Sequence, residues 1–510
     1  MSAEITSNIK TEKRVIILLL ILPNIFFFLH NLAEFMERIL TDEVLYLFIA
    51  YSIVSIFLFI IIKSVFRQTS LFAAIFSNLI ITVFLFFGIL QDFLLRFKQF
   101  GFLSNTFFLL ISAITLLFII SYFIRKNKKR MKPTSRYLLM LFSVLISYES
   151  ILIAYKTATG KTIAAITDRM ISPVKIETDS IAEKPDIYYI VFDGYTGPAS
   201  LKEYWGFEND IYPYLNSRGF YTIDSAFSNY KSTPFSISSV LNLQYLTGSE
   251  PYLYSNSSNF LIGQQVYKKN ILFSFLKKQQ YDFSIFSQLE NKKMLTAFGF
   301  LGVEKPVNWL RKLTIERIYL DPWKLNKLKS LFSLGSAQQT VKLESMMKFD
   351  GYNKKAIDHI FSDCDKSSEG KLSKPVFSYT HFMLPHDPYL RDESGNLVDS
   401  PQPGGMNMNG YLRQIKYSNL LIKKITDCLL SDTSRKKIII IQGDHGYRHN
   451  PDAPENRQFE ALNAIYFYNQ DYKGLRKNMS HVNTFRVVLN NIFGSHLLLL
   501  DDKSFVLKSE

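Results

Sequence analysis

The stretch KKIIIIQGDHG, residues 436–446, has four consecutive isoleucines followed by a polar turn between two glycines. A continuous apolar run of this length is typical of a strand that a parallel sheet buries on both faces. The turn contains a carboxylate and an imidazole side by side, Asp444 and His445. Ligands of open α/β sheets bind outside the carboxyl ends of the strands. The stretch therefore predicts both a parallel sheet and a polar site at its edge.

Two other stretches have the same design. DIYYIVFDG, residues 186–194, ends at Asp193, and SKPVFSYTHF, residues 373–382, contains His381 and is followed by Pro385-His386-Asp387-Pro388. Helical patterns lie between these apolar runs, at 211–217, 235–246, 266–279, 341–362 and 410–430. Strands that alternate with helices predict an α/β domain with a mainly parallel central sheet.

The first 155 residues have a different composition. The whole chain of 510 residues is 47% hydrophobic and only 20% charged, and its apolar residues crowd into this part. Five apolar stretches approach or exceed the roughly 20 residues that cross a bilayer as a helix. The first is longer than a signal-peptide core and lacks a small-residue cleavage site, so we expect it to be retained. The predicted spans are 14–32, 45–62, 71–95, 106–124 and 137–155.

Basic residues mark one side of these spans. They precede the first span, follow the second and fill the loop 125–136 before the fifth, whereas the other loops are poorer in positive charge. The positive-inside rule then places the N-terminus in the cytoplasm and everything after Tyr155 outside it. The basic loops that set the topology contribute part of the net charge of +15, so this charge does not indicate nucleic-acid binding. We therefore exclude nucleic acid as a partner. We expect a transmembrane domain over 1–155, a linker over 156–185 and an extracytoplasmic catalytic domain over 186–510.

The polar residues after the strands suit metal chemistry. A carboxylate beside an imidazole is a ligand pair for zinc or manganese, although an Asp-His turn also occurs without a metal. A hydroxyl-rich stretch, SNYKSTPFSISSVLN at 228–242, supplies candidate nucleophiles. Pro234 suits the first turn of a helix, which places Thr233 at the N-cap. Ordinary helix capping is enough to explain a threonine at this position. In the functional interpretation, the positive end of the helix also favours an alkoxide on Thr233 and a bound phosphate.

Four motifs together carry a family resemblance. Their order and the five spans before them resemble the membrane-anchored, sulfatase-like branch of the alkaline phosphatase superfamily, which includes lipoteichoic acid synthases and lipid A phosphoethanolamine transferases. The resemblance implies a bundle of five transmembrane helices followed by an α/β alkaline-phosphatase/sulfatase-like domain. The motifs are Phe192-Asp193-Gly194, Asn229-Tyr230-x-x-Thr233-x-x-Ser236, Pro385-His386-Asp387-Pro388-Tyr389 and Gly443-Asp444-His445-Gly446.

The resemblance also implies roles for individual residues. One divalent metal ion, manganese or zinc foremost and magnesium or calcium as alternatives, would be held by Asp193, Thr233, Asp444 and His445. Thr233 would be the nucleophile and form a phospho-threonine, with Ser232 as the runner-up. His386 would contact the phosphoryl group or the acceptor. The expected substrate-binding residues are His381, His386, Arg448 and His449. The alternatives are that His381 only packs beneath the site and that Arg448 and His449 are solvated loop residues.

The implied activity is the transfer of a phospholipid-derived head group, phosphoglycerol or phosphoethanolamine, to a glycan or lipid of the cell envelope. The enzyme would lie in a bacterial cytoplasmic membrane. Two departures from the family pattern bear on this expectation. The transferases usually carry Glu where this chain has Asp193, and Ser232-Thr-Pro-Phe-Ser236 lacks the Arg of the Cys/Ser-x-Pro-x-Arg sulfatase motif. The alternatives are a phosphodiesterase or sulfuric-ester hydrolase with the same site, and a non-catalytic scaffold for envelope assembly.

The chain has two cysteines, Cys364 and Cys428, both in the predicted extracytoplasmic domain. A disulfide is chemically possible there. The sequence does not show that the two residues meet, and two unpaired thiols remain the alternative.

Overall fold

The computed structural model describes residues 2–34, 42–95, 102–159, 163–179, 184–246, 248, 257–290, 306–320, 337–370, 372–402, 407–450 and 453–505. Contacts group the chain into two compact units. One unit consists of Met1–Ala165 and Glu304–Gln338, and the other of Ile166–Val303 and Gln339–Glu510. The domain boundaries expected from the sequence stay a prediction.

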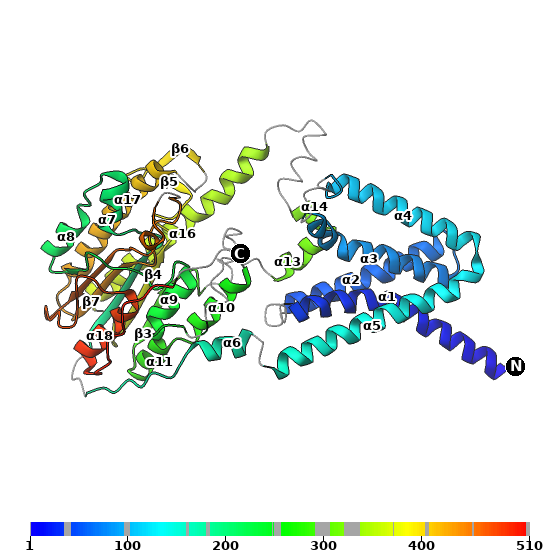
Figure 1. The fold of residues 1–510 in the computed structure, drawn as a ribbon, viewed down its shortest axis with the longest axis horizontal. Helices are drawn as coiled ribbons and strands as arrows, with labels where there is room; N and C mark the ends of the chain where they lie inside the picture. The colour runs from blue at the N-terminus through cyan, green and yellow to red at the C-terminus, as the bar shows by residue number, and fades with distance from the viewer. Residues whose placement is uncertain are drawn as a thin grey trace. The chain divides into compact units, whose positions relative to one another are not determined.

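The first unit contains five helices that are long and apolar enough to cross a membrane, as the sequence predicts (Figure 1). Polar side chains join them inside the bundle: Asn24 donates to Ser55 at 3.0 Å, and His30 lies 2.8 Å from Glu149. Such pairs give polar side chains the hydrogen-bond partners that lipid tails do not offer. The helices are α1 (Ser2–Glu34), α2 (Asp42–Ser64), α3 (Ser70–Leu95), α4 (Thr106–Lys126) and α5 (Met131–Ala158).

Two short helices from a later part of the sequence also belong to this unit. They are α13 (Pro306–Leu313) and α14 (Arg317–Leu320), and α13 packs on α2 and α3 (Figure 1). The sequence does not predict this packing, because a segment of eight to fifteen residues is too short to read as a membrane span.

The second unit contains a six-stranded sheet in the order β2-β8-β7-β1-β4-β3. Strands β7, β1, β4 and β3 are parallel, and β8 and β2 continue the sheet in antiparallel pairing. The mainly parallel α/β sheet is therefore confirmed. The strands are β1 (Asp186–Phe192), β2 (Tyr221–Thr222), β3 (Asp282–Phe286), β4 (Val376–Phe382), β7 (Lys437–Gly443) and β8 (Asn463–Phe467); a separate hairpin contains β5 (Tyr389–Arg391) and β6 (Leu397–Gln402).

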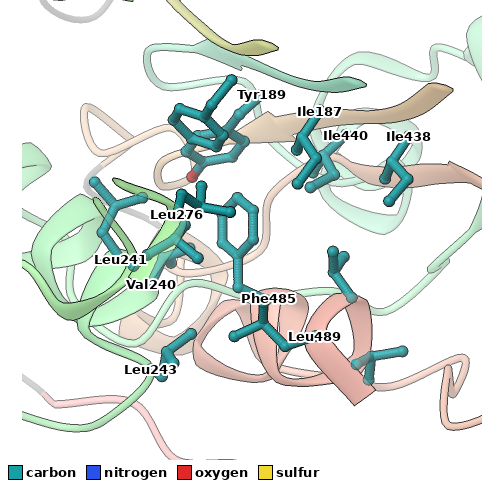
Figure 2. Packing of buried hydrophobic residues seen from close by; sticks show 14 of the residues in the cluster. Ile187, Tyr189, Val240, Leu241, Leu243, Leu276, Ile438, Ile440, Phe485 and Leu489 are labelled. Carbon is teal, nitrogen blue, oxygen red and sulfur yellow. The ribbon is translucent and has the colours of Figure 1, made fainter. Parts of the chain in front are cut away.

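Helices cover both faces of this sheet (Figure 1). Every residue of β1 is buried, and alternate side chains enter opposite layers. Ile187 and Tyr189 pack with Phe485 in one core (Figure 2), whereas Tyr188 and Ile190 belong to the other. This two-sided burial explains the absence of a polar alternation in the strand sequences.

The helices of the second unit largely follow the predicted pattern. The predicted helix at 266–279 was wrong, because Asn270 caps a new helix through its side chain, which accepts from the Phe273 N–H. The predicted segment thus spans the end of α10 and all of α11. The helices are α6 (Ile163–Met170), α7 (Pro198–Trp205), α8 (Ile211–Ser217), α9 (Thr233–Asn242), α10 (Ser257–Lys268), α11 (Ile271–Lys278), α16 (Ala337–Ser368), α17 (Met408–Ser431) and α18 (Thr484–Phe493).

A disulfide bond joins Cys364 of α16 to Cys428 of α17. The structure thus favours the paired state over the two free thiols that the sequence left as an alternative. The bond closes a loop between residues 64 positions apart and links two helices on the same face of the sheet.

Candidate active site

Three neighbouring parallel strands end at the same level. Phe192, the last residue of β1, pairs with Phe382 of β4 on one side and Gly443 of β7 on the other. The residues that follow β1 and β7 are Asp193 and Asp444, so the sheet register alone brings these carboxylates together. Gly194 supports the turn with a left-handed φ of 73°.

Asp444 is fixed through one of its two carboxylate oxygens. Its Oδ1 accepts hydrogen bonds from the backbone N–H groups of Gly194 at 2.8 Å and His445 at 2.9 Å. Gly443 permits the close backbone packing behind it, since a Cβ there would lie 2.4 Å from the carbonyl oxygen of Tyr195. The second oxygen, Oδ2, points toward His445 Nε2 at 3.5 Å.

The tautomer of His445 follows from its surroundings. Its Nδ1 lies 2.8 Å from the carbonyl oxygen of Gly446, which only accepts hydrogen bonds, so Nδ1 carries the proton. The lone pair of a neutral ring is then on Nε2. This atom lies 3.5 Å from Asp193 Oδ1 and 3.5 Å from Asp444 Oδ2.

Asp193 completes the cluster. Its Oδ2 accepts from Gln288 Nε2 at 3.2 Å, which leaves Oδ1 facing the other two groups. Among the described residues, Asp193 Oδ1, Asp444 Oδ2 and His445 Nε2 are buried without a hydrogen-bond partner. Each of the three residues offers an atom, and these atoms lie within 4.8 Å of one another. Two carboxylate oxygens and an imidazole lone pair that converge in this way fit a divalent cation.

The charges of these groups depend on one another. Burial, together with the charge of Asp444, raises the pKa of Asp193 to about 7. Burial also opposes ionisation of Asp444, but His445, His381, the Gly194 N–H and the Thr233 hydroxyl outweigh it and hold the pKa of Asp444 below its usual value. Burial lowers the pKa of His445 to about 3. At neutral pH the imidazole is therefore a neutral ligand, as metal binding requires.

Thr233 lies at the start of α9, where its hydroxyl helps to lower the pKa of Asp444. The expectation that Thr233 is the N-cap was wrong by one residue: Ser232 is the cap, with extended dihedrals, and Thr233 is the first helical residue. Pro234 lies in the first turn, as predicted. A second hydroxyl anchors the helix, because Ser236 Oγ donates to the Asp444 carbonyl oxygen at 2.6 Å. The nucleophile candidate is thus held against the cluster by its own helix.

Histidines border the hollow next to the cluster. His386 follows β4, and its Nδ1 lies 2.6 Å from the carbonyl oxygen of Asp387 and 3.0 Å from Asp387 Oδ1. His449 Nε2 lies 3.8 Å from the same carboxylate oxygen. The lining of this hollow includes Gly194, His386, His445, Arg448 and His449.

The other two predicted residues lie at different depths. Arg448 is half-buried and donates to the Lys231 carbonyl oxygen at 2.7 Å, just before α9. His381 is fully buried inside β4, with Nδ1 bonded to the Tyr379 hydroxyl at 2.8 Å and Nε2 3.8 Å from Asp193 Oδ2. His381 thus packs beneath the cluster, whereas Arg448 borders the hollow.

Two residues near the cluster were not predicted from the sequence. Gln288 contacts Asp193 and follows β3, so the carboxyl end of a fourth parallel strand was the signal for it. His481 is fully buried, and neither ring nitrogen has a partner among the described residues. Burial lowers its pKa to about 3, although the negative charge of Asp444 acts to raise it. No local pattern in the sequence distinguishes this histidine.

The chain matches known proteins over the same region. The family model named Sulfatase matches residues 200–488, which is more than half of the chain. The protein belongs to the sulfatase family. The matched part includes Thr233, His386, Asp444 and His445, whereas Asp193 lies just before it.

Solved structures resemble this sulfatase-family chain at low sequence identity. The C-terminal periplasmic domain of EptC from Escherichia coli, also solved in complex with Zn, is 12% identical with a TM-score of 0.36, and the match covers 64% of this chain and 86% of that one. Phosphoethanolamine transferase EptC from Campylobacter jejuni is 14% identical, with a TM-score of 0.36 and coverages of 61% and 89%. Lipooligosaccharide phosphoethanolamine transferase A from Neisseria meningitidis is 12% identical, with a TM-score of 0.35 and coverages of 62% and 90%.

Proposed function

We propose that this protein is a membrane-bound phosphotransferase. It takes a phospho-head group, phosphoglycerol or phosphoethanolamine, from a membrane phospholipid and transfers it to a glycan or lipid of the cell envelope through phospho-Thr233. The observation that carries the proposal is the cluster of Asp193, Asp444 and His445. The start of α9, with Thr233, lies against this cluster, because Ser236 Oγ donates to the Asp444 carbonyl oxygen at 2.6 Å. A nucleophile, a metal-type ligand set and a helix N-terminus meet there in a chain with five apolar helices.

Asp193, Thr233, Asp444 and His445 would hold one divalent metal, manganese or zinc foremost. A bound metal lowers the pKa of a coordinated hydroxyl and offsets charge on phosphoryl oxygens. The protein's own groups complete the site. The N–H groups at the start of α9, beside Thr233, favour an anionic phosphate. Arg448 adds a positive charge on the edge of the hollow.

The reaction has two steps. In the first, Thr233 loses its proton to solvent, its Oγ bonds to phosphorus, and the bond from phosphorus to the diacylglycerol oxygen breaks. His386 gives a proton to the departing oxygen. In the second step, the acceptor hydroxyl gives its proton to His386 and bonds to phosphorus. The bond to Thr233 then breaks, and its oxygen regains a proton from solvent. His386 suits this exchange because the acceptor atoms around its Nδ1 keep that nitrogen protonated.

Location outside the cytoplasm is part of the proposal. The basic loops support a cytoplasmic N-terminus and an α/β domain on the other side of a bacterial cytoplasmic membrane. The disulfide between Cys364 and Cys428 supports an oxidising compartment for that domain. A site on this side faces the head groups of the outer leaflet and the envelope acceptors.

A hydrolase with the same site is the second candidate. Water would then take the place of the acceptor hydroxyl on a phosphodiester or a sulfate ester. The stretch Ser232–Ser236 has the Ser and Pro of the sulfatase nucleophile motif but lacks its Arg. This departure weighs against sulfate-ester hydrolysis. The five apolar helices, which would anchor the protein in the membrane, favour a lipid donor.

Mass spectrometry of the full-length protein tests the proposal. The protein in detergent is incubated with mixed phospholipids and manganese or zinc, and its peptides are then analysed. We expect a phosphoglycerol or phosphoethanolamine adduct on Thr233, which Thr233→Ala removes and Ser232→Ala keeps. Release of free head group without a labelled glycan would favour the hydrolase. Full activity of Thr233→Ala would contradict the mechanism, and absence of both metal and adduct would favour a non-catalytic scaffold.

A further inference from the structure

The chain joins its two compact units at three places. It passes from the helical unit to the catalytic unit after Ala165, returns at Glu304, and leaves again after Gln338. A simple membrane anchor needs only the first of these connections. The described part of the returning segment is 306–320, which contains α13 and α14.

Apolar contacts hold this segment in the helical bundle. Leu310 is fully buried in a cluster that includes Phe27 of α1, Tyr51 of α2 and Leu85 of α3. Trp309 and Leu313 pack against the same cluster. Side chains from three membrane helices therefore surround one face of α13.

A glycine allows the closest approach between the segment and α3. A Cβ atom at Gly88 would lie 2.3 Å from the Lys312 carbonyl oxygen and 2.6 Å from that of Leu313. Real Cβ atoms do not come this close to backbone, so any larger residue at this position must displace the segment. Gly88 thus forms a notch in α3 that fits the end of α13.

Polar contacts continue from the notch along α3. The Ile315 N–H donates to the Phe84 carbonyl oxygen at 2.9 Å. Arg317 Nη1 donates to the Gly88 carbonyl oxygen at 2.6 Å, and Arg317 Nη2 pairs with Asp92 Oδ1 at 2.8 Å. Two backbone carbonyls one helical turn apart are thereby used as acceptors, although both already belong to a helix. These contacts specify one position of the segment along α3.

The position of the notch fixes its side of the membrane. Five successive crossings place the C-terminal ends of α1, α3 and α5 on one side, whichever way the bundle is oriented. Gly88 and Asp92 lie in the last two turns of α3, and the chain leaves the bundle at the end of α5. The segment therefore binds the side from which the catalytic part of the chain emerges.

We propose that residues 306–320 form a docking element for the protein's own membrane helices and that this docking is required for turnover of lipid donors. The second half of the proposal rests on the proposed function. A second attachment to the bundle raises the effective concentration of the catalytic part of the chain at the bilayer surface, without any new contact to the donor. Turnover of a donor dissolved in water does not depend on this concentration at the bilayer.

Cysteine cross-linking in native membranes tests the docking. The variant with Phe84→Cys and Ile315→Cys places two thiols where the backbones are hydrogen-bonded. The two natural cysteines are bonded to each other and do not compete. We expect a cross-link between the two peptides after mild oxidation. Ile315→Cys combined with Ile151→Cys, on the exposed face of α5, is the matched control and should not cross-link.

Activity measurements test the consequence. Gly88→Ala and the charge reversal Arg317→Glu are each assayed with phospholipid in liposomes and with a water-soluble aryl phosphodiester. We expect lipid turnover to fall about tenfold or more, since the lost attachment lowers the effective concentration, with turnover of the soluble diester unchanged. Adding Asp92→Arg to Arg317→Glu should restore lipid turnover. Gly351→Ala, at a helical glycine with open space around it, is the control for Gly88→Ala.

Each outcome bears on the proposal. A cross-link together with a selective loss of lipid turnover supports it. A missing cross-link, unchanged lipid turnover, or an equal loss on both substrates overturns it. If the wild-type protein turns over neither substrate, the proposed function fails, and the cross-link alone then decides whether the segment docks.

Discussion

His445 Nε2 lies 3.5 Å from Asp193 Oδ1, although the two residues follow different strands and lie far apart in the sequence. The parallel pairing of β1 with β7 brings them together, because Phe192 and Gly443 share one level of the sheet. The other polar atoms of both side chains are already used, by Gln288 and by the Gly446 carbonyl oxygen. Only the atoms that face each other remain for a ligand.

Asp193→Asn is predicted to remove the metal from the protein. The amide keeps the shape of the side chain but loses the charged oxygen that faces His445 Nε2. We expect metal affinity to fall more than about 100-fold, beyond the loss that outer-shell substitutions cause. Isothermal titration and elemental analysis of the purified protein measure it. Gln288→Ala, which removes only the hydrogen bond to Asp193, should cost about tenfold, and full metal content of Asp193→Asn would contradict the ligand role.

Metal binding is predicted to weaken as the pH falls below neutrality. In the metal-free protein the pKa of Asp193 is raised to about 7, so this carboxyl holds a proton below that pH and must lose it to bind a cation. His445, with a pKa of about 3, does not add to the effect near neutrality. Apparent affinity should fall by about tenfold for each pH unit below 7, with release of one proton per metal. Titrations in buffers of different ionisation enthalpy count the protons, and a pH-independent affinity between about pH 5 and 7 would contradict the shift.

The sequence could predict the sheet and the main ligands because both depend on local patterns. Continuous apolar runs in β1, β4 and β7 signal burial on two faces, and polar residues after such strands gather at one edge of the sheet. Asp193, Asp444 and His445 follow from this rule. The sheet order does not, because it depends on long-range pairing that no local pattern specifies.

What the sequence could not predict depends on tertiary contacts. Gln288 becomes part of the cluster only through its hydrogen bond to Asp193. The N-cap of α9 differs from the prediction by one residue, since Ser232 and Thr233 are both good caps and packing decides between them. The docking of α13 depends on the missing side chain of Gly88, which a sequence pattern does not relate to Leu313.

Asp387→Asn is predicted to slow turnover without removing the metal. Burial opposes ionisation of Asp387, but the neighbouring His449, His386 and Arg448 hold the pKa of this carboxyl below its usual value. The carboxylate oxygen Oδ1 lies 3.0 Å from His386 Nδ1 and so helps to orient this ring. We expect the rate to fall about tenfold, part of the ~10²- to 10⁴-fold that an acid–base group contributes.

The Asp387 prediction is checked by kcat on a phospholipid donor and by metal content measured on the same sample. Glu393→Gln removes an exposed carboxylate from the same region and should leave kcat unchanged. An aryl phosphodiester, whose leaving group needs little protonation, should be less affected by Asp387→Asn than the lipid. Equal losses on both donors would indicate a structural effect instead.

The double variant with Cys364→Ala and Cys428→Ala is predicted to destabilise the α/β unit without changing its site. The bond closes a loop between residues 64 positions apart, and loss of that cross-link allows the unfolded chain more freedom. The expected cost is about 4 kcal/mol in the free energy of unfolding, on the chain-entropy model. Both cysteines lie on helices that pack on the opposite face of the sheet from α9, so metal content should stay stoichiometric in the folded protein. Denaturant titration of the oxidised, reduced and double-variant proteins measures the cost. The reduced wild-type protein and the double variant should unfold at the same denaturant concentration, and equal stability of all three proteins would show that the two cysteines are not bonded.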